Sequence, residues 1–185
     1  MVPTWPGDAA ETPWEDETAA VLADAEAALV KRLRTRSLSE REASTFLRER
    51  ELVDGAIEEV LDRLRGLGYL DDAALAEQLV HSGVERKGQG RALLGQSLAK
   101  RGIPRDVIDA ALAELPDDEA DRALEFARQK ARTMRDLDHD TALRRLSGQL
   151  ARRGYGATAL SAARQALDEL GRPARRAPAG TVRFE

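Results

Sequence analysis

The sequence lacks cysteine and contains few aromatic residues. None of its 185 residues is a cysteine, which excludes disulfides, thiolate nucleophiles and cysteine-type zinc sites. Aromatic residues make up only 4% of the chain, and no run of alternating β-branched residues occurs, so we predict no β-sheet. The chain also lacks an apolar stretch near the ~20 residues that a membrane span needs, and a basic-then-apolar signal peptide. We therefore expect a cytoplasmic protein that does not bind a membrane.

The residue constellations of common enzymes are missing as well. The sequence has no GxxxxGKS/T phosphate loop, no GxSxG elbow and no HExxH or CxxC pair. His81 and His139 have no partner at metal-ligand spacing, and we interpret them as solvated helix residues. The acid pairs at 71–72 and 117–118 offer oxygen ligands for magnesium, but their place at predicted helix starts explains them without a metal. We expect no catalytic activity, no metal and no cofactor.

Charge is distributed unevenly along the chain. Charged residues make up 34% of the sequence, and the formal net charge is −4. Residues 1–26 hold seven of the 33 acids and no base, which leaves 26 acids against 29 bases in the rest of the chain. Because the remainder is only slightly basic, its charge argues against strong autonomous binding to DNA.

The chain is organised around the stretch 37–72. Ser39, followed three residues later by Glu42, predicts a capping box and therefore a helix start. Apolar residues then recur at three- and four-residue intervals in two successive segments, which predicts two helices. Gly66 and Gly68 predict the end of the second helix. The residues expected to face inward are Ala43, Phe46, Leu47, Ile57, Val60, Leu61, Leu64 and Leu67.

This helix–turn–helix pattern returns twice, at offsets of 51 and 52 residues. Such a period predicts a repeat array, in which each unit buries its apolar face against its neighbours. The turn holds Glu51 in the first copy but Gly102 and Gly154 in the others. The first turn must therefore differ in backbone geometry or hold a strained non-glycine residue. The aligned segments are 47–57, 98–108 and 150–160.

We predict an all-α protein of three tandem three-helix repeats, which form an elongated, curved array. Proline and glycine among acids predict a disordered N-terminal tail, and proline, glycine and arginine predict a disordered C-terminal tail. Each repeat is short and thinly apolar, so none is expected to be stable alone. The predicted divisions are an acidic tail at 1–17, repeats at 18–70, 71–115 and 116–170, and a second tail at 171–185.

Basic residues surround the second helix of the second repeat and occupy the matching helix of the third. Arginine forks bind phosphates or carboxylates with paired hydrogen bonds, which suits DNA and an acidic protein groove equally. The alternative is a solvated helix face paired with neighbouring acids. The candidate binding residues are Arg86, Lys87, Arg91, Lys100 and Arg101 in the second repeat and Arg144, Arg145, Arg152 and Arg153 in the third.

Two other groups of residues have structural explanations. Lys31, Arg32, Arg34 and Arg36 follow the first predicted helical stripe, where cations favour the helix dipole. Tyr69 and Tyr155 each close a helix–turn junction, so we expect them to pack and not to stack on nucleic-acid bases.

One segment carries a family resemblance. Gly68-Tyr69-Leu70-Asp71-Asp72, preceded by residues 57–64 and followed by the basic stretch 86–91, resembles the RecX family of recombination regulators. Residues 98–108 are similar to that family's second repeat, and the resemblance covers about residues 18–170. It implies three tandem three-helix repeats without catalytic residues. It also implies that the protein binds the RecA recombinase, lies in the groove of the RecA–DNA filament, and inhibits RecA ATPase and strand exchange.

We hypothesise that the array touches several RecA subunits at once, so that weak contacts reinforce one another. We expect a monomer. An autonomous helix-turn-helix-like module that binds DNA directly is one alternative, and a purely structural helical scaffold is another. Binding to naked duplex with a steep salt dependence, whether or not RecA is present, would favour the first alternative.

Overall fold

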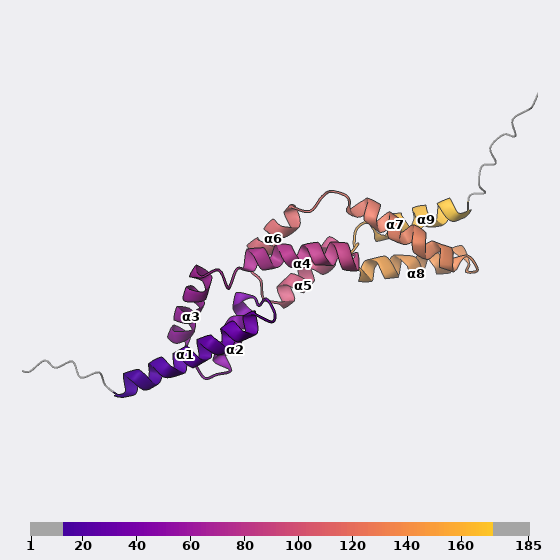
Figure 1. The fold of residues 1–185 in the computed structure, drawn as a ribbon. Coiled ribbons are helices and arrows are strands. Elements are labelled where there is room, and N and C mark those ends of the chain that lie inside the picture. Colours follow the sequence, from indigo (N-terminus) through magenta and orange to yellow (C-terminus); the bar gives the residue numbers. More distant parts are fainter. Residues whose placement is uncertain (1–12, 172–185) are drawn as a thin grey trace, which may run out of the picture. The chain divides into compact units, whose positions relative to one another are not determined.

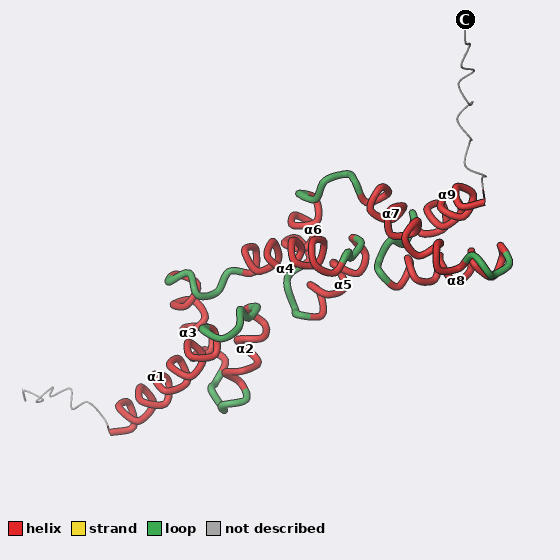
Figure 2. The backbone as a smooth tube through the Cα atoms, turned by 45° about the vertical axis from the view of Figure 1, so that its right-hand side comes forward, coloured by secondary structure: helices red, strands yellow, loops and turns green. Residues whose placement is uncertain are grey.

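A computed structural model describes residues 13–171, which form nine α-helices and one short 3-10 helix (Figure 1). Between these residues there is no β-strand, as Figure 2 shows, so the predicted all-α class is confirmed. The helices are α1 (Pro13–Leu33), α2 (Glu40–Arg48), α3 (Asp54–Gly66), α4 (Asp72–Lys87), α5 (Arg91–Lys100), α6 (Arg105–Ala113), α7 (Glu119–Ala131), η1 (Arg132–Met134), α8 (His139–Arg152) and α9 (Ala159–Gly171).

The predicted tails lie mostly outside the described residues. Residues 1–12 and 172–185 are not described, so the expectation of disorder there stays a prediction. Helix α1 begins at Pro13, five residues before the predicted start at Thr18. Proline fits this position because the first turn of a helix needs no backbone N–H from it.

The described chain divides into two compact units. Residues 13–78 and 98–108 belong to the first unit, and residues 79–97 and 109–171 belong to the second. Helices α4, α5 and α6 therefore contribute residues to both units. This division does not follow the three predicted repeats, whose boundaries stay a prediction from the sequence.

The first unit packs α1, α2 and α3 around an aliphatic core. The predicted capping box starts α2: the Ser39 hydroxyl accepts a hydrogen bond from the Glu42 N–H at 3.1 Å, and the Glu42 carboxylate accepts one from the Ser39 N–H at 3.1 Å. Seven of the eight predicted inward-facing residues are buried. The exception is Leu67, which lies beyond the end of α3 and is 62% exposed, so its predicted burial is wrong.

The second unit packs α7, α8 and α9 against one another. Alanines dominate this core, including Ala123, Ala127 and Ala131 on α7 and Ala163 on α9. Small side chains let helix backbones approach closely, which allows an alanine-rich core to be well packed. Asp138 starts α8 by accepting a hydrogen bond from the Thr141 N–H at 2.9 Å.

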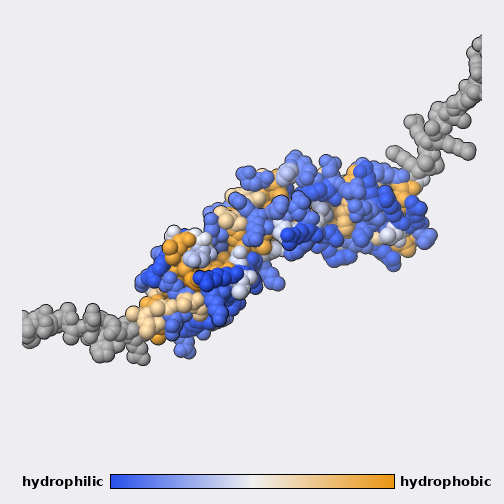
Figure 3. Space-filling model, viewed as in Figure 1, coloured by the Kyte–Doolittle hydropathy of each residue, from blue (hydrophilic) through white to orange (hydrophobic). Residues whose placement is uncertain are grey.

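Most of the visible surface is hydrophilic, with smaller hydrophobic areas (Figure 3). No helix of the described part combines the length and apolar character needed to cross a membrane. The same residues contain no group of three or more histidine or acidic side chains placed to hold a metal ion.

Candidate functional site

The second helix of the first repeat begins against two elements of the second repeat, and we call this contact the first joint. The Ser39 hydroxyl donates a hydrogen bond to the Arg101 carbonyl at 2.6 Å. The Glu40 N–H donates to the Asp72 carboxylate at 3.0 Å. Because the first N–H groups of a helix have no partner within it, the Asp72 carboxylate satisfies a backbone donor at the α2 N-terminus. The contact therefore joins consecutive repeats within the first unit.

A charged cluster completes the first joint. The Glu42 carboxylate accepts hydrogen bonds from the guanidinium groups of Arg101, with Nε at 3.1 Å, and Arg36, at 3.0 Å. Arg101 also donates to the Ser37 carbonyl at 2.7 Å. Burial alone would raise the pKa of Glu42, but the hydrogen bonds from Arg101 and the Ser39 N–H outweigh it and lower the pKa below 4.5. Glu42 is therefore held as a carboxylate.

The second joint has the same arrangement within the second unit. At the start of α5, the Gly90 N–H donates to the Arg153 carbonyl at 2.8 Å, and the Arg91 N–H donates to the Glu119 carboxylate at 2.7 Å. Glu119 is the first residue of α7, as Asp72 is of α4. The two joints thus follow one rule. The start of a middle helix contacts two groups of the next repeat: the carbonyl that follows its middle helix and the acid that begins its first helix.

Tyr155 and Arg153 close the second joint with their side chains. The Tyr155 hydroxyl donates to the Gly88 carbonyl at 3.1 Å, and the ring is only 2% exposed, so its predicted packing is confirmed. The Arg153 guanidinium donates to the Lys87 carbonyl at 2.7 Å and lies 4.3 Å from the centre of the Phe126 ring. Both side chains are therefore committed to the fold.

The joints explain where the turn requires glycine. Gly102 and Gly154 have positive φ angles of 81° and 90°. A Cβ atom at Gly102 would overlap the Arg41 side chain, and one at Gly154 would overlap the Leu93 backbone. Glu51 has the same left-handed geometry, with φ 63°, so of the two predicted alternatives the structure has the strained non-glycine residue and not a different backbone geometry. Glu51 is the first-repeat counterpart of these two glycines, and its side chain is exposed.

The structure separates the nine predicted binding residues into two groups. Arg101 and Arg153 are joint residues, and Arg91 donates to the carbonyls of Leu112 at 2.6 Å and Leu115 at 2.9 Å. These three side chains are engaged within the chain. Their predicted role in partner binding, like that of the others, stays a prediction. The six exposed candidates are Arg86, Lys87, Lys100, Arg144, Arg145 and Arg152.

The Gly68–Asp72 motif has mainly structural roles. Gly68 takes a positive φ of 72° after α3, and Leu70 is 2% exposed. Asp71 accepts a hydrogen bond from the Ala74 N–H at 2.9 Å, which agrees with the predicted helix start. Burial raises the pKa of the Asp72 carboxyl, although the hydrogen bond from Glu40 opposes this. Tyr69 is 45% exposed, so its predicted packing is wrong.

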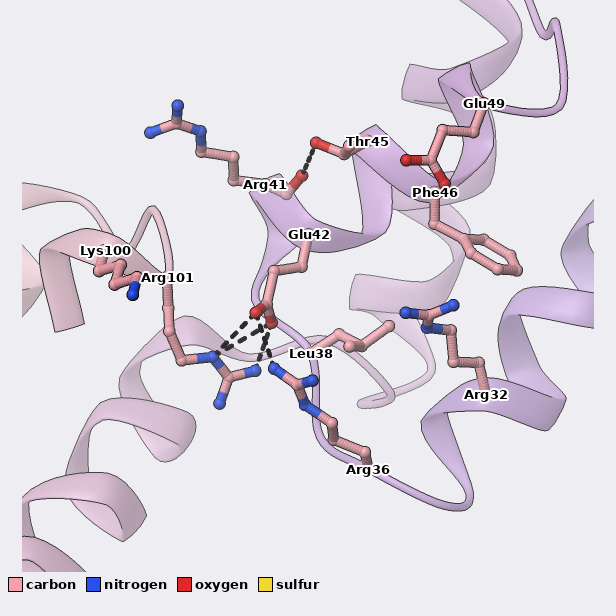
Figure 4. Close-up of a pocket in the computed structure, with 10 residues that line it drawn as sticks. All are labelled: Arg32, Arg36, Leu38, Arg41, Glu42, Thr45, Phe46, Glu49, Lys100 and Arg101. Carbon is pink, nitrogen blue, oxygen red and sulfur yellow. Dashed lines mark hydrogen bonds and ion pairs between the residues drawn. The ribbon is translucent and has the colours of Figure 1, made fainter. Parts of the chain in front are cut away.

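A basic pocket of about 280 Å³ lies beside the first joint, and sequence reasoning missed most of it (Figure 4). Its floor includes the buried side chains of Leu38 and Phe46. Arg32, Arg36 and Arg41 were not predicted as binding residues, because the helix dipole explained the first two. The cations that line the pocket are Arg32, Arg36, Arg41, Lys100 and Arg101, and the acids are Glu42 and Glu49.

Known proteins resemble this chain in sequence over most of its length. The family domain described as "RecX, second three-helix domain" matches residues 71–112. Regulatory protein RecX of Streptomyces coelicolor is 39% identical over 133 residues, which cover 71% of this chain and 71% of that protein. Regulatory protein RecX of Mycolicibacterium smegmatis is 42% identical over 133 residues, which cover 69% and 68%.

A solved structure shares the fold. The crystal structure of RecX from Lactobacillus salivarius matches with a TM-score of 0.74 and 19% identity, over 82% of this chain and 99% of that chain. A second crystal structure of regulatory protein RecX matches with a TM-score of 0.70 and 23% identity. The extent and identity of the sequence matches show that this chain belongs to the RecX family, whose members are regulatory proteins and not enzymes.

Proposed function

We propose that this protein binds the RecA–DNA filament in its groove and inhibits RecA ATPase and strand exchange. The observation that carries the proposal is membership of the RecX family, supported by 39% identity over 133 residues. The residues add a physical basis, because exposed cations occur in both compact units. A filament of protein and DNA presents phosphates and carboxylates together, and arginine and lysine side chains can bind both.

The proposed inhibition depends on several contacts made at the same time. A filament repeats the same binding surface along its length, so a chain with several basic faces can contact more than one subunit. Once one face is bound, the others are held at a high effective concentration, which raises the overall affinity without a single strong site. Occupation of the groove would then exclude a second DNA strand.

The direct test is to titrate the DNA-dependent ATPase of RecA with the purified protein. We expect suppression well below one copy per RecA, because a protein that acts on filament growth or disassembly need not coat every subunit. Charge reversal at Arg144, Arg145 and Arg152 should weaken this inhibition while leaving the helical circular dichroism unchanged. These side chains are exposed, whereas Arg153 belongs to the second joint and must be kept. Unchanged ATPase activity with wild-type protein would contradict the proposal.

Autonomous DNA binding is the second candidate function, and the six exposed predicted cations favour it. A protein that uses them on phosphates should bind duplex DNA without RecA, and its affinity should fall steeply with salt. Equal affinity for naked DNA and for the RecA filament would support this candidate over the first.

A further inference from the structure

We propose that the basic pocket receives an acidic peptide segment of a protein partner and, when filled, holds the first joint closed. The pocket is the surface defined above by Arg32, Arg41 and Lys100 around the Glu42–Arg101 pair. The identification of that partner as RecA rests on the proposed function, whereas the acidic chemistry of the ligand does not.

The pocket contains cations that form no ion pair within the described chain, although Arg32 also lies over the Phe46 ring. No ion pair joins Arg32, Arg41 or Lys100 to any other residue between 13 and 171. Five cations face only two acids, Glu42 and Glu49, so the pocket keeps a surplus of positive charge. A concave site with like charges close together attracts anions more strongly than the same charges dispersed on a convex surface.

Carboxylate is the anion that this pocket already binds. Figure 4 shows the Glu42 carboxylate between the guanidinium groups of Arg36 and Arg101. The lowered pKa of Glu42 agrees with this. Burial raises the pKa, but the hydrogen bonds and nearby guanidinium groups lower it by more, so the pocket favours a charged carboxylate. A second carboxylate brought by a partner would find the remaining cations in the same cavity.

The aromatic residue of the pocket argues against single-stranded nucleic acid. Sites for single strands pair basic side chains with aromatic rings on which bases stack. Here the Phe46 ring is only 7% exposed, and the guanidinium groups of Arg32 and Arg50 lie 5.0 and 3.7 Å from its centre. No ring face is left for a base.

The pocket takes its residues from two consecutive repeats, and all of these residues belong to the first unit. Arg32 and Arg41 belong to the first repeat, whereas Lys100 and Arg101 follow from the middle helix of the second. A ligand that contacts both groups adds contacts across the first joint. Binding energy available only in the closed arrangement stabilises that arrangement. The pocket thus couples partner binding to the rigidity of the joint.

The experiment compares two variants of the full chain with the same change in charge. The pocket variant carries Arg32→Gln, Arg41→Gln and Lys100→Gln. The control carries Lys31→Gln, Arg34→Gln and Arg132→Gln, which remove exposed cations that do not line the pocket. Circular dichroism and urea unfolding first confirm that both fold. Binding is then measured by fluorescence anisotropy with a short labelled peptide rich in glutamate and leucine, and separately with labelled oligothymidylate.

We expect the pocket variant to bind the peptide about tenfold more weakly than wild type, and the control to bind it nearly as wild type does. The peptide should also slow amide exchange at residues 39–42 and 101–103 in wild type only. Equal weakening in both variants would overturn the proposal, because it would show a general charge effect. Loss of oligothymidylate binding with unchanged peptide binding would also overturn it, in favour of nucleic acid. Neither arm contains RecA, so wild-type protein that binds the peptide but leaves RecA ATPase unchanged would contradict only the proposed function.

Discussion

The first joint contains a cluster of paired charged side chains, whereas the second relies more on a direct backbone contact and a buried tyrosine. In the first, Glu42 and Arg101 form an ion pair beside the Ser39 contact. In the second, the Gly90 N–H meets the Arg153 carbonyl directly, and Tyr155 caps the Gly88 carbonyl. Both joints thus use a carboxylate to cap a middle helix, and the first adds a cluster of paired side-chain charges that links its stability more strongly to pH and added anions.

The repeat offset shows which substitutions make the joints differ. At 51 residues beyond the pocket, the second repeat has Gly83 in place of Arg32, Ala92 in place of Arg41 and Leu93 in place of Glu42. The basic pocket therefore has no counterpart at the second joint. The second joint is closely packed, so we interpret it as a fixed structural contact. The first joint holds exposed charges, so we interpret it as the contact whose strength changes with ligands and solution conditions.

Alanine substitution of the turn glycines should give the largest effect and the sharpest contrast. Gly154→Ala places a Cβ against the Leu93 backbone at a positive φ, so we expect a loss of about 3 kcal/mol in the free energy of unfolding. Gly102→Ala places a Cβ against the Cβ, Cγ and Cδ atoms of Arg41, of which only the outer two can move away, so the loss should be about 2 kcal/mol. Urea unfolding followed by circular dichroism measures both. Equal losses would contradict the claim that the second joint is the tighter one.

The helices and their ends could be predicted from local sequence. The capping box of Ser39 and Glu42 and the stop at Gly66 and Gly68 involve residues a few positions apart, so their geometry follows from the helix itself. Of the eight positions that the apolar spacing predicted to face inward in this stretch, seven are buried. The predicted burial of Leu67 was wrong because α3 ends one residue before it. The apolar spacing continues in the sequence beyond the point where the backbone leaves the helix.

The joints and the pocket could not be predicted in this way. Ser39 and Arg101 are 62 residues apart, and no local pattern shows that one donates to the other. Arg32 and Arg36 already had a sufficient local explanation at the end of a helix, which concealed their place in the pocket. Arg101 and Arg153 were predicted as binding residues for their charge, whereas matching glycines directly after them signalled a close contact. The repeated Arg-Gly pair was thus the available signal.

Neutralising Glu42 should separate the joints by their dependence on pH. We expect Glu42→Gln to lower the free energy of unfolding by about 1–2 kcal/mol at neutral pH, because a partly buried ion pair loses its charge. The folded-state pKa of Glu42 is lowered, so its contribution is present above the usual value of 4.5 and is lost as pH falls through the folded-state pKa. The two proteins should therefore have nearly equal free energies of unfolding at acidic pH. Urea unfolding at a series of pH values measures this.

Asp72 provides a control of opposite sign at the same joint. Burial raises its folded-state pKa, so its titration favours the folded state at low pH, and this contribution is lost as pH rises through that pKa. Asp72→Asn keeps a side-chain oxygen as an acceptor for the Glu40 N–H and removes the titration. The two variants should thus change the pH profile in opposite directions. If both variants changed the pH dependence of stability in the same direction, the contacts of the first joint would not be the cause of the two pKa shifts.

Replacing Glu51 with glycine should give the smallest effect, and the only gain. Glu51 holds φ 63°, where an L side chain is strained, and the side chain is exposed. We expect Glu51→Gly to raise the free energy of unfolding by about 0.5–1 kcal/mol, because relief of the left-handed strain exceeds the added entropy of the unfolded chain. Glu51→Ala retains the Cβ and should bring no such gain. A lower free energy of unfolding in both variants would contradict this expectation. It would show that the Glu51 side chain stabilises the first turn, in contrast to the glycines at the matching positions of the other two repeats.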